Sequence, residues 1–161
     1  MKSSHHYHLS LQWTGNTGKG TVDYDAYSRD HIFTAEGKPE LLGSSDKPFR
    51  GDAARYNPEE LLLASLSSCH MLWYLHLCAV NKIIVLKYYD IPEATMEEEP
   101  DGSGKFREAI LKPEVTVADE KMISTALKLH HEANKKCFIA NSINFPIYHQ
   151  PVIRVKEQTQ K

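Results

Sequence analysis

The 161 residues carry 19 basic and 21 acidic side chains, so the net charge is −2 and bulk electrostatics do not favour nucleic acid or an anionic membrane surface as a partner. This length fits a single domain over residues 1–161, at most divided into two small lobes around one core. The N-terminus lacks the apolar stretch of a signal peptide, and the longest apolar run, residues 71–80, is too short to cross a bilayer, so a cytoplasmic location is expected.

The first third of the chain predicts short strands joined by turns. Alternation of polar and apolar residues predicts strands at residues 8–13, 21–24 and 31–34. Residues 37–56 contain glycines, prolines and many charges. They predict a long loop, a kind of segment that often carries function.

A long apolar helix is predicted at residues 58–80. Asn57 is a side-chain cap, Pro58 presets φ at the first helical position, and Glu59 lies where the helix dipole favours a carboxylate. Beyond its first turn the helix has almost no charge, so we expect it to be buried nearly all round. One small sheet cannot cover such a helix, and a homodimer that packs two of these helices together is therefore predicted.

The second half of the chain predicts more strands and one amphipathic helix. Strands are expected at residues 83–89, at a segment ending near residue 96, and at 105–117, where Pro113 suggests a sheet edge or a bulge. Helical spacing of apolar residues predicts a helix at 119–135, followed by a short helix and a last strand at 146–155. Because the strands come in clusters, the fold class is α+β rather than a doubly wound sheet.

Cys69 is the first candidate for chemistry, because cysteines in a cytoplasmic chain suggest catalysis, metal binding or packing before a structural disulfide. Glu59 lies ten residues earlier on the same helix, and a thiol with a carboxylate forms two parts of a redox or nucleophilic site. The alternative is packing, since a buried cysteine is more often a small apolar residue. Cys78, nine residues after Cys69, points to the opposite side of the helix and is predicted to be structural.

Histidines offer weaker candidates. His70 and His76 lie near Cys69 on the helix and could tune its thiol or bind substrate, but a hydrogen-bonded core histidine is favoured for each. His130, His131 and the histidines at positions 5, 6 and 8 suggest metal binding. None has a closed zinc spacing with the cysteines, so neither a metal nor another cofactor is expected.

These residues together resemble the OsmC/Ohr family, the osmotically inducible protein C and organic hydroperoxide resistance proteins. The likeness rests on the Asn-Pro-Glu-Glu-Leu run at residues 57–61, on Cys69 ten residues after Glu59, and on Cys137 after an amphipathic helix. It covers about residues 13–155. The resemblance implies an intertwined homodimer with two buried central helices against antiparallel sheets, and a peroxiredoxin-like antioxidant activity that reduces organic hydroperoxides and, more slowly, hydrogen peroxide.

The resemblance also implies the role of each site residue. Cys69 falls where the family has its peroxide-attacking cysteine, Cys137 where it has the resolving cysteine, and Glu59 on an acid that orients an arginine. Arg29 is preferred for that arginine over Arg50. The two lysines before Cys137, and a short helix expected to begin there, predict a lowered pKa for its thiol. An external dithiol, for which a lipoyl group is one candidate, would restore the reduced pair.

Some residues depart from the family pattern. Phe138 stands where the family usually has proline after the resolving cysteine, and Ser68 and His70 flank the reactive one. The chain therefore resembles a less characterised branch. Two other functions stay open: a non-catalytic module that binds a small ligand in an apolar pocket walled by Trp73 and Tyr74, and a metal-binding protein that uses the cysteines and a histidine.

Overall fold

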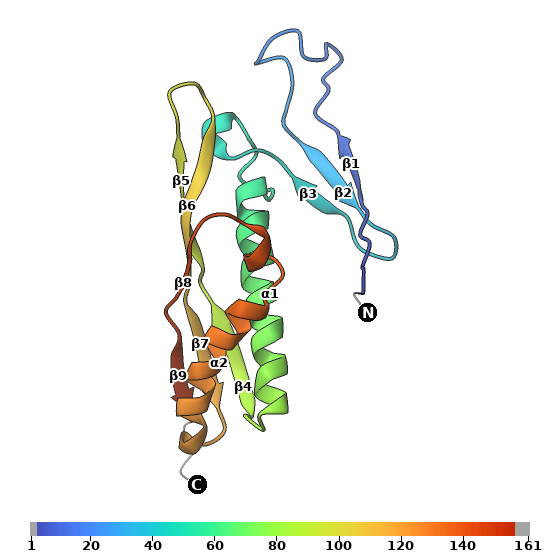
Figure 1. Cartoon of the computed structure of the whole chain (residues 1–161). Coiled ribbons are helices and arrows are strands. Elements are labelled where there is room, and N and C mark those ends of the chain that lie inside the picture. The colour runs from blue at the N-terminus through green and yellow to red at the C-terminus, as the bar shows by residue number, and fades with distance from the viewer. Residues whose placement is uncertain (1–2, 157–161) are drawn as a thin grey trace. The chain divides into compact units, whose positions relative to one another are not determined.

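The computed structural model describes residues 3–156 and confirms the α+β class (Figure 1). The chain forms two compact units that divide between Leu61 and Leu62. The first unit holds one small sheet, and the second holds two helices with two further sheets.

The first unit is built on an antiparallel sheet of β1 (Ser10–Trp13), β2 (His31–Thr34) and β3 (Leu41–Gly43), in the order β1-β2-β3. The predicted strand at 21–24 is wrong. The Asn16 side chain accepts hydrogen bonds from the backbone N–H groups of Gly18 and Gly20, and Asp23 accepts one from Asp25. These local bonds favour turns over a strand. The predicted loop at 37–56 contains β3 and a short 3₁₀ helix, Lys47–Phe49.

The long helix α1 runs from Pro58 to Val80, as predicted. Its start is a capping box: Asn57 Oδ1 accepts from Glu60 N at 2.7 Å, and Glu60 Oε2 accepts from Asn57 N at 3.2 Å. The helix ends at Val80, two residues before Lys82, a non-glycine residue with φ of 58°, and Ile83 N then donates back to the Cys78 carbonyl at 2.8 Å.

Burial of α1 is much narrower than predicted. Within the chain its buried residues form one stripe at a spacing of four: Leu66, His70, Tyr74 and Cys78. Leu72 and Val80 are 62% and 61% exposed. The expectation of burial nearly all round is therefore wrong for the single chain, because the chain's own sheets and second helix cover only one side of α1.

By length and composition α1 could also cross a membrane. That is a weak indication, since the core helix of a soluble protein passes the same test. Here the stripe of α1 that includes His70 and Tyr74 contributes to the core of the second unit, and we treat α1 as a core helix.

The second unit has two three-stranded sheets. One has the order β4 (Val85–Asp90), β7 (Pro113–Val117), β9 (Val152–Val155), and the other β5 (Glu93–Glu98), β6 (Gly104–Leu111), β8 (Ile147–His149). The pairs β4–β7 and β5–β6 are antiparallel, whereas β6–β8 and β7–β9 are parallel.

Two strands predicted as continuous are each divided. The segment 105–117 breaks at Lys112, whose N–H donates to Asp90 Oδ1 at 2.7 Å instead of continuing a ladder. Pro113 then opens β7, which is the middle strand of its sheet, so the predicted edge or bulge is wrong; the first position of a strand tolerates a missing N–H. The segment 146–155 divides into β8 and β9.

The predicted amphipathic helix is α2, Ile123–Lys136, preceded by a 3₁₀ turn at Glu120–Met122 and followed by another at Ala140–Ser142. The buried Ala126 and Ala133 of α2 pack with Tyr74 of α1 and with Val115 and Val117 of β7. Both helices therefore pack on one face of β7. A second core cluster is formed by Leu66, Ala109, Leu111 and Cys137.

Candidate active site

The structure brings Cys69 and Cys137 together in the second unit. Cys69 lies on α1 and packs against the core cluster that contains Cys137, the C-terminal cap residue of α2. The Cys69 side chain is a neighbour of the Cys137 thiol that affects its pKa, and both thiols are free. Cys69 is partly exposed, whereas Cys137 is 0% exposed. Two thiols separated by 68 positions in the sequence are thus in contact, one open to solvent and one closed.

The electrostatics of Cys137 differ from the prediction. Burial, and then the neighbouring Cys69 side chain, raise the pKa of Cys137 to about 12, although the N–H of Ala140 points at its sulfur from 3.4 Å and acts in the opposite sense. The predicted lowering is wrong because burial of the thiol is the largest cause, and the helix and the lysines do not act on the thiol as predicted. Cys137 caps the C-terminus of α2, where the helix dipole disfavours an anion, and the Lys135 ammonium is bound to Glu132 at 2.9 Å.

Aromatic side chains surround the exposed side of the thiol pair. Trp73 packs against the same cluster as Cys69, and Phe138, 66% exposed, meets it edge to face at 5.7 Å. An open pocket of about 230 Å³ is lined by Leu72, Trp73 and His76. The expected pocket wall at Tyr74 is wrong, because Tyr74 is fully buried, and the expected core position of His76 is wrong as well, because His76 is exposed.

The predicted arginines lie in the first unit and already have partners there. Arg29 donates to the carbonyls of Tyr27 and Tyr24 at 2.6 and 2.7 Å, and its guanidinium lies over both rings at 4.3 and 4.0 Å. Arg50 forms an ion pair with Asp25. Glu59 is partly buried in the first turn of α1, and within residues 3–156 it forms no ion pair with either arginine. An arginine that activates Cys69 stays a prediction.

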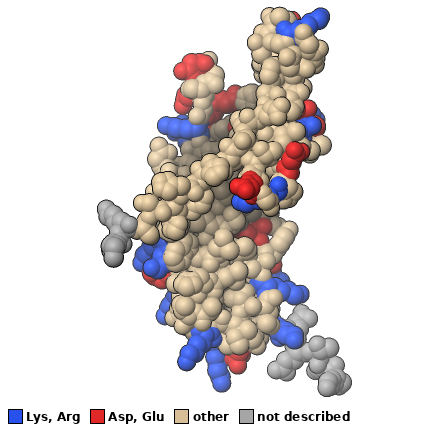
Figure 2. Space-filling model, turned by 90° about the vertical axis from the view of Figure 1, so that its right-hand side faces the viewer, with Lys and Arg blue, Asp and Glu red and all other residues tan. Residues whose placement is uncertain are grey.

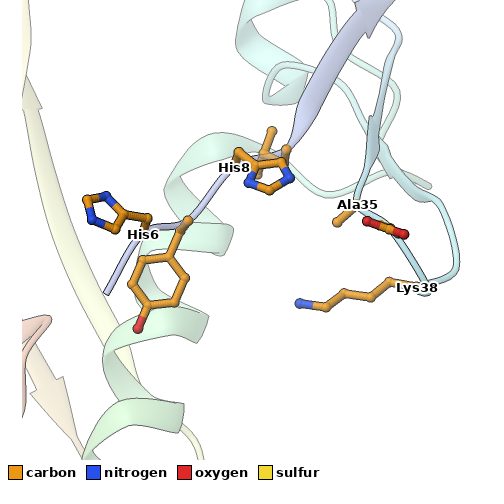
Figure 3. Close-up of a pocket in the computed structure, with 7 residues that line it drawn as sticks. His6, His8, Ala35 and Lys38 are labelled. Carbon is orange, nitrogen blue, oxygen red and sulfur yellow. The ribbon is translucent and has the colours of Figure 1, made fainter. Parts of the chain in front are cut away.

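A further pocket lies in the first unit and is unrelated to the predicted residues. It has a volume of about 680 Å³ and is open to solvent. Figure 3 shows its N-terminal side, where the rings of His6 and His8 lie apart, and its other side at Ala35 and Lys38. Across residues 3–156 no three His, Cys, Asp or Glu side chains are arranged to hold a metal ion.

Sequence reasoning favoured a hydrogen-bonded core histidine for His70, which is confirmed, but missed its partner. His70 Nε2 lies 3.0 Å from His130 Nδ1 on α2, and both residues are nearly fully buried. The ring of His149 lies 4.5 Å from that of His70. Burial, with the nearby His149 as the next cause, lowers the pKa of both His70 and His130 to about 3. The signal in the sequence was the place of His130 between Ala126 and Ala133 on the apolar stripe of α2.

The geometry defines an α+β protein in which two packed helices bring two reduced thiols into contact. The chain belongs to the OsmC-like protein family, whose sequence model matches residues 51–150. No curated protein sequence matches it.

Solved structures with the same fold span nearly the whole chain. An OsmC-like protein of unknown function from Vibrio cholerae is 26% identical, with a TM-score of 0.83 over 92% of this chain and 100% of that one. An organic hydroperoxide resistance protein OsmC from Legionella pneumophila is 18% identical, with a TM-score of 0.67 over 96% and 100% of the two chains. A similar protein from Elizabethkingia anophelis, also described as an organic hydroperoxide resistance protein, is 18% identical, with a TM-score of 0.66 over 97% and 100%.

Proposed function

We propose that this protein is a cytoplasmic, thiol-dependent peroxidase that reduces organic hydroperoxides and, more slowly, hydrogen peroxide. The observation that carries the proposal is the contact between Cys69 and Cys137. The partly exposed Cys69 can meet a substrate and the closed Cys137 cannot, so attack falls to Cys69 and resolution to Cys137. Membership in the OsmC-like family supports this chemistry, and two structures of the same fold are described as organic hydroperoxide resistance proteins.

The proposed cycle needs no bound cofactor. The Cys69 thiolate attacks an oxygen of the hydroperoxide, so that an S–O bond forms, the O–O bond breaks and the alkoxide leaves as an alcohol after taking up a proton. Cys137 then attacks the sulfenic acid on Cys69, and water leaves as the disulfide forms. An external dithiol, for which a lipoyl group is one candidate, supplies two electrons and two protons to restore both thiols.

A cation is needed to favour the Cys69 thiolate, and Arg29 is our preferred source. Arg50 is already neutralised by Asp25, whereas the partners of Arg29 in the described chain are neutral carbonyls and aromatic rings. The charge of Arg29 is therefore still available to a thiolate. In this proposal Glu59 orients the guanidinium through a two-pronged contact.

The exposed side of α1 supports a homodimer. Leu72 and Val80 are each more than half exposed in the single chain, and α1 has no Asp, Glu, Lys or Arg after Glu60. Figure 2 shows areas of the molecular surface without such charged side chains. Burial of such apolar surface against a second α1 would remove it from water. We therefore propose that the working form is a homodimer whose other partners are the hydroperoxide and the dithiol.

The test is consumption of tert-butyl hydroperoxide in the presence of a dithiol, with dihydrolipoamide compared to dithiothreitol. Cys69→Ser should abolish turnover while the protein stays folded. Cys137→Ser should still consume one equivalent and leave a sulfenic acid or over-oxidised Cys69, detected by mass spectrometry. Full turnover in Cys69→Ser would exclude the mechanism.

A second candidate is a non-catalytic module that binds a small hydrophobic ligand. It is favoured by the open pocket at Leu72, Trp73 and His76. The same assay separates the two functions, because a binding module would show no turnover with any dithiol and would show ligand-dependent quenching of Trp73 fluorescence.

A further inference from the structure

His70 and His130 form a direct hydrogen bond between two neutral imidazoles. Their nitrogens are 3.0 Å apart, the ring planes differ by 9°, and the ring centroids are 5.3 Å apart. For comparison, the face-to-face rings of Tyr74 and His130 have centroids 3.8 Å apart. The two imidazoles therefore lie side by side, close to one plane, and a single proton between the facing nitrogens completes the bond. A metal ion does not fit between nitrogens this close that point at each other.

The two bonded histidines lie on the same two helices as the two thiols or their caps. His70 follows Cys69 directly on α1, and His130 lies seven residues, about two helical turns, before Cys137 on α2. We propose that the His70–His130 bond is a positioning pair that holds Cys137 closed against Cys69, and that its protonation in mild acid releases the C-terminal part of α2 and exposes Cys137. The inference rests on the proposed function only where it names Cys137 as the resolving thiol.

Protonation breaks the pair because an imidazolium has no acceptor nitrogen, so two protonated rings would present only donors to each other. Little in the surroundings would compensate. His70 Nδ1 and His130 Nε2 are buried without a hydrogen-bond partner, and the one carboxylate close to His149, that of Asp90, already accepts from Ser67 Oγ and Lys112 N. The other titratable groups around the pair are neutral or cationic: Tyr74 and Cys78 from α1, His131 from α2, Tyr88 from β4 and His149 from β8.

The proposal makes the labelling of Cys137 depend on pH in an unusual direction. An ordinary thiol reacts about tenfold more slowly for each pH unit below its pKa, because the thiolate is lost. The closed form takes up protons only near pH 3, whereas released histidines do so near 6.5. Two protons multiply the open population by up to about 10² for each pH unit below 6.5, which exceeds the loss of thiolate. Labelling of Cys137 should therefore become about sixfold faster between pH 6 and pH 5.

The experiment measures N-ethylmaleimide labelling of Cys137 and Cys69 in the full chain by mass spectrometry, between pH 5 and pH 7.5 and without peroxide. In the wild type, labelling of Cys137 should slow from pH 7.5 to about pH 6.5 and then become faster as the pH falls further, whereas labelling of Cys69 should slow over the whole range. The variant His70→Gln/His130→Asn keeps a neutral hydrogen bond in the same place without a titrating group. In this variant the labelling rate of Cys137 should fall about tenfold for each pH unit. His76→Gln, at an exposed histidine on the same helix, should behave as the wild type.

Two results would overturn the proposal. One is a labelling rate of wild-type Cys137 that falls in parallel with that of Cys69 between pH 6 and pH 5, and this result needs no variant. The other concerns the labelling of Cys137 in acid at low concentrations of urea. Local release of part of α2 exposes little surface, so urea should accelerate this labelling much less than it promotes global unfolding, and an equal dependence on urea would contradict the proposal. Since no hydroperoxide is used, a chain without peroxidase activity can still pass this test, and an active peroxidase can fail it.

Discussion

Replacing Cys69 with alanine should make Cys137 more acidic. Burial is the larger cause of the raised pKa of Cys137 and the neighbouring Cys69 side chain the next, and together they raise it from 9.0 to about 12. The rise of about three units lowers the thiolate fraction at neutral pH about 10³-fold. Cys69→Ala removes the second cause and leaves the first, so the pKa should fall below its wild-type value and stay above 9.

The assay is iodoacetamide alkylation of Cys137 between pH 7 and pH 11, followed by mass spectrometry. In the folded wild type, the alkylation rate of Cys137 should still rise about tenfold per pH unit above pH 9. In the same chain unfolded in urea, the alkylation rate should level off near pH 9. Restricted access of iodoacetamide to Cys137 would lower the alkylation rate by the same factor at every pH. A raised pKa would instead shift the pH at which the rate levels off, so this pH distinguishes the two causes. Cys78→Ala is the matched control, because Cys78 lies with Tyr74 in the first core cluster, whereas Cys137 lies in the second. A wild-type plateau near pH 9, or an identical profile in Cys69→Ala, would refute the reasoning.

Three further predictions concern stability and assembly. Because the folded pKa values of His70 and His130 are lowered to about 3, their contribution to the free energy of unfolding should be complete above pH 6.5 and should fall below it. The loss for the two histidines together should be about 4 kcal/mol at pH 5. Equal free energies of unfolding in urea at pH 7 and pH 5 would contradict this. Lys82→Gly should stabilise the fold by about 1 kcal/mol, since Lys82 holds a φ of 58° that glycine adopts freely; chemical denaturation measures it, and a lowered midpoint would count against it. Analytical ultracentrifugation at micromolar concentration should show a dimer. A monomer at that concentration would contradict the proposed homodimer.

The sequence predicted those features that depend on neighbouring residues. The start of α1 follows from the capping box of Asn57 and Glu60, and α2 follows from the spacing of its apolar residues. The strand at 21–24 failed for a local reason that the pattern of hydrophobicity does not contain, because Asp23 forms a hydrogen bond that favours a turn.

Features that depend on residues far apart in the sequence could not be predicted from the sequence. His70 and His130 are separated by 60 positions, and nothing in either segment indicates that the other is the partner. The pKa of Cys137 was predicted in the wrong direction for the same reason. Its two preceding lysines are visible in the sequence, whereas its burial and the nearness of Cys69 appear only after α2 packs on α1. A sequence also cannot show how much of an apolar helix a single chain covers.

The pairing of Cys69 and Cys137 gives a physical order to the proposed cycle. While Cys69 is reduced, its neighbouring side chain helps to raise the pKa of Cys137, and any charge on Cys69 opposes a second thiolate beside it. Oxidation of Cys69 to a sulfenic acid removes that negative charge, and the N–H of Ala140 still points at the Cys137 sulfur. The resolving thiol therefore becomes easier to ionise only after the first step has occurred. A thiol that is a poor nucleophile in the resting protein is thus consistent with a resolving role, because it is protected from reaction until Cys69 has been oxidised.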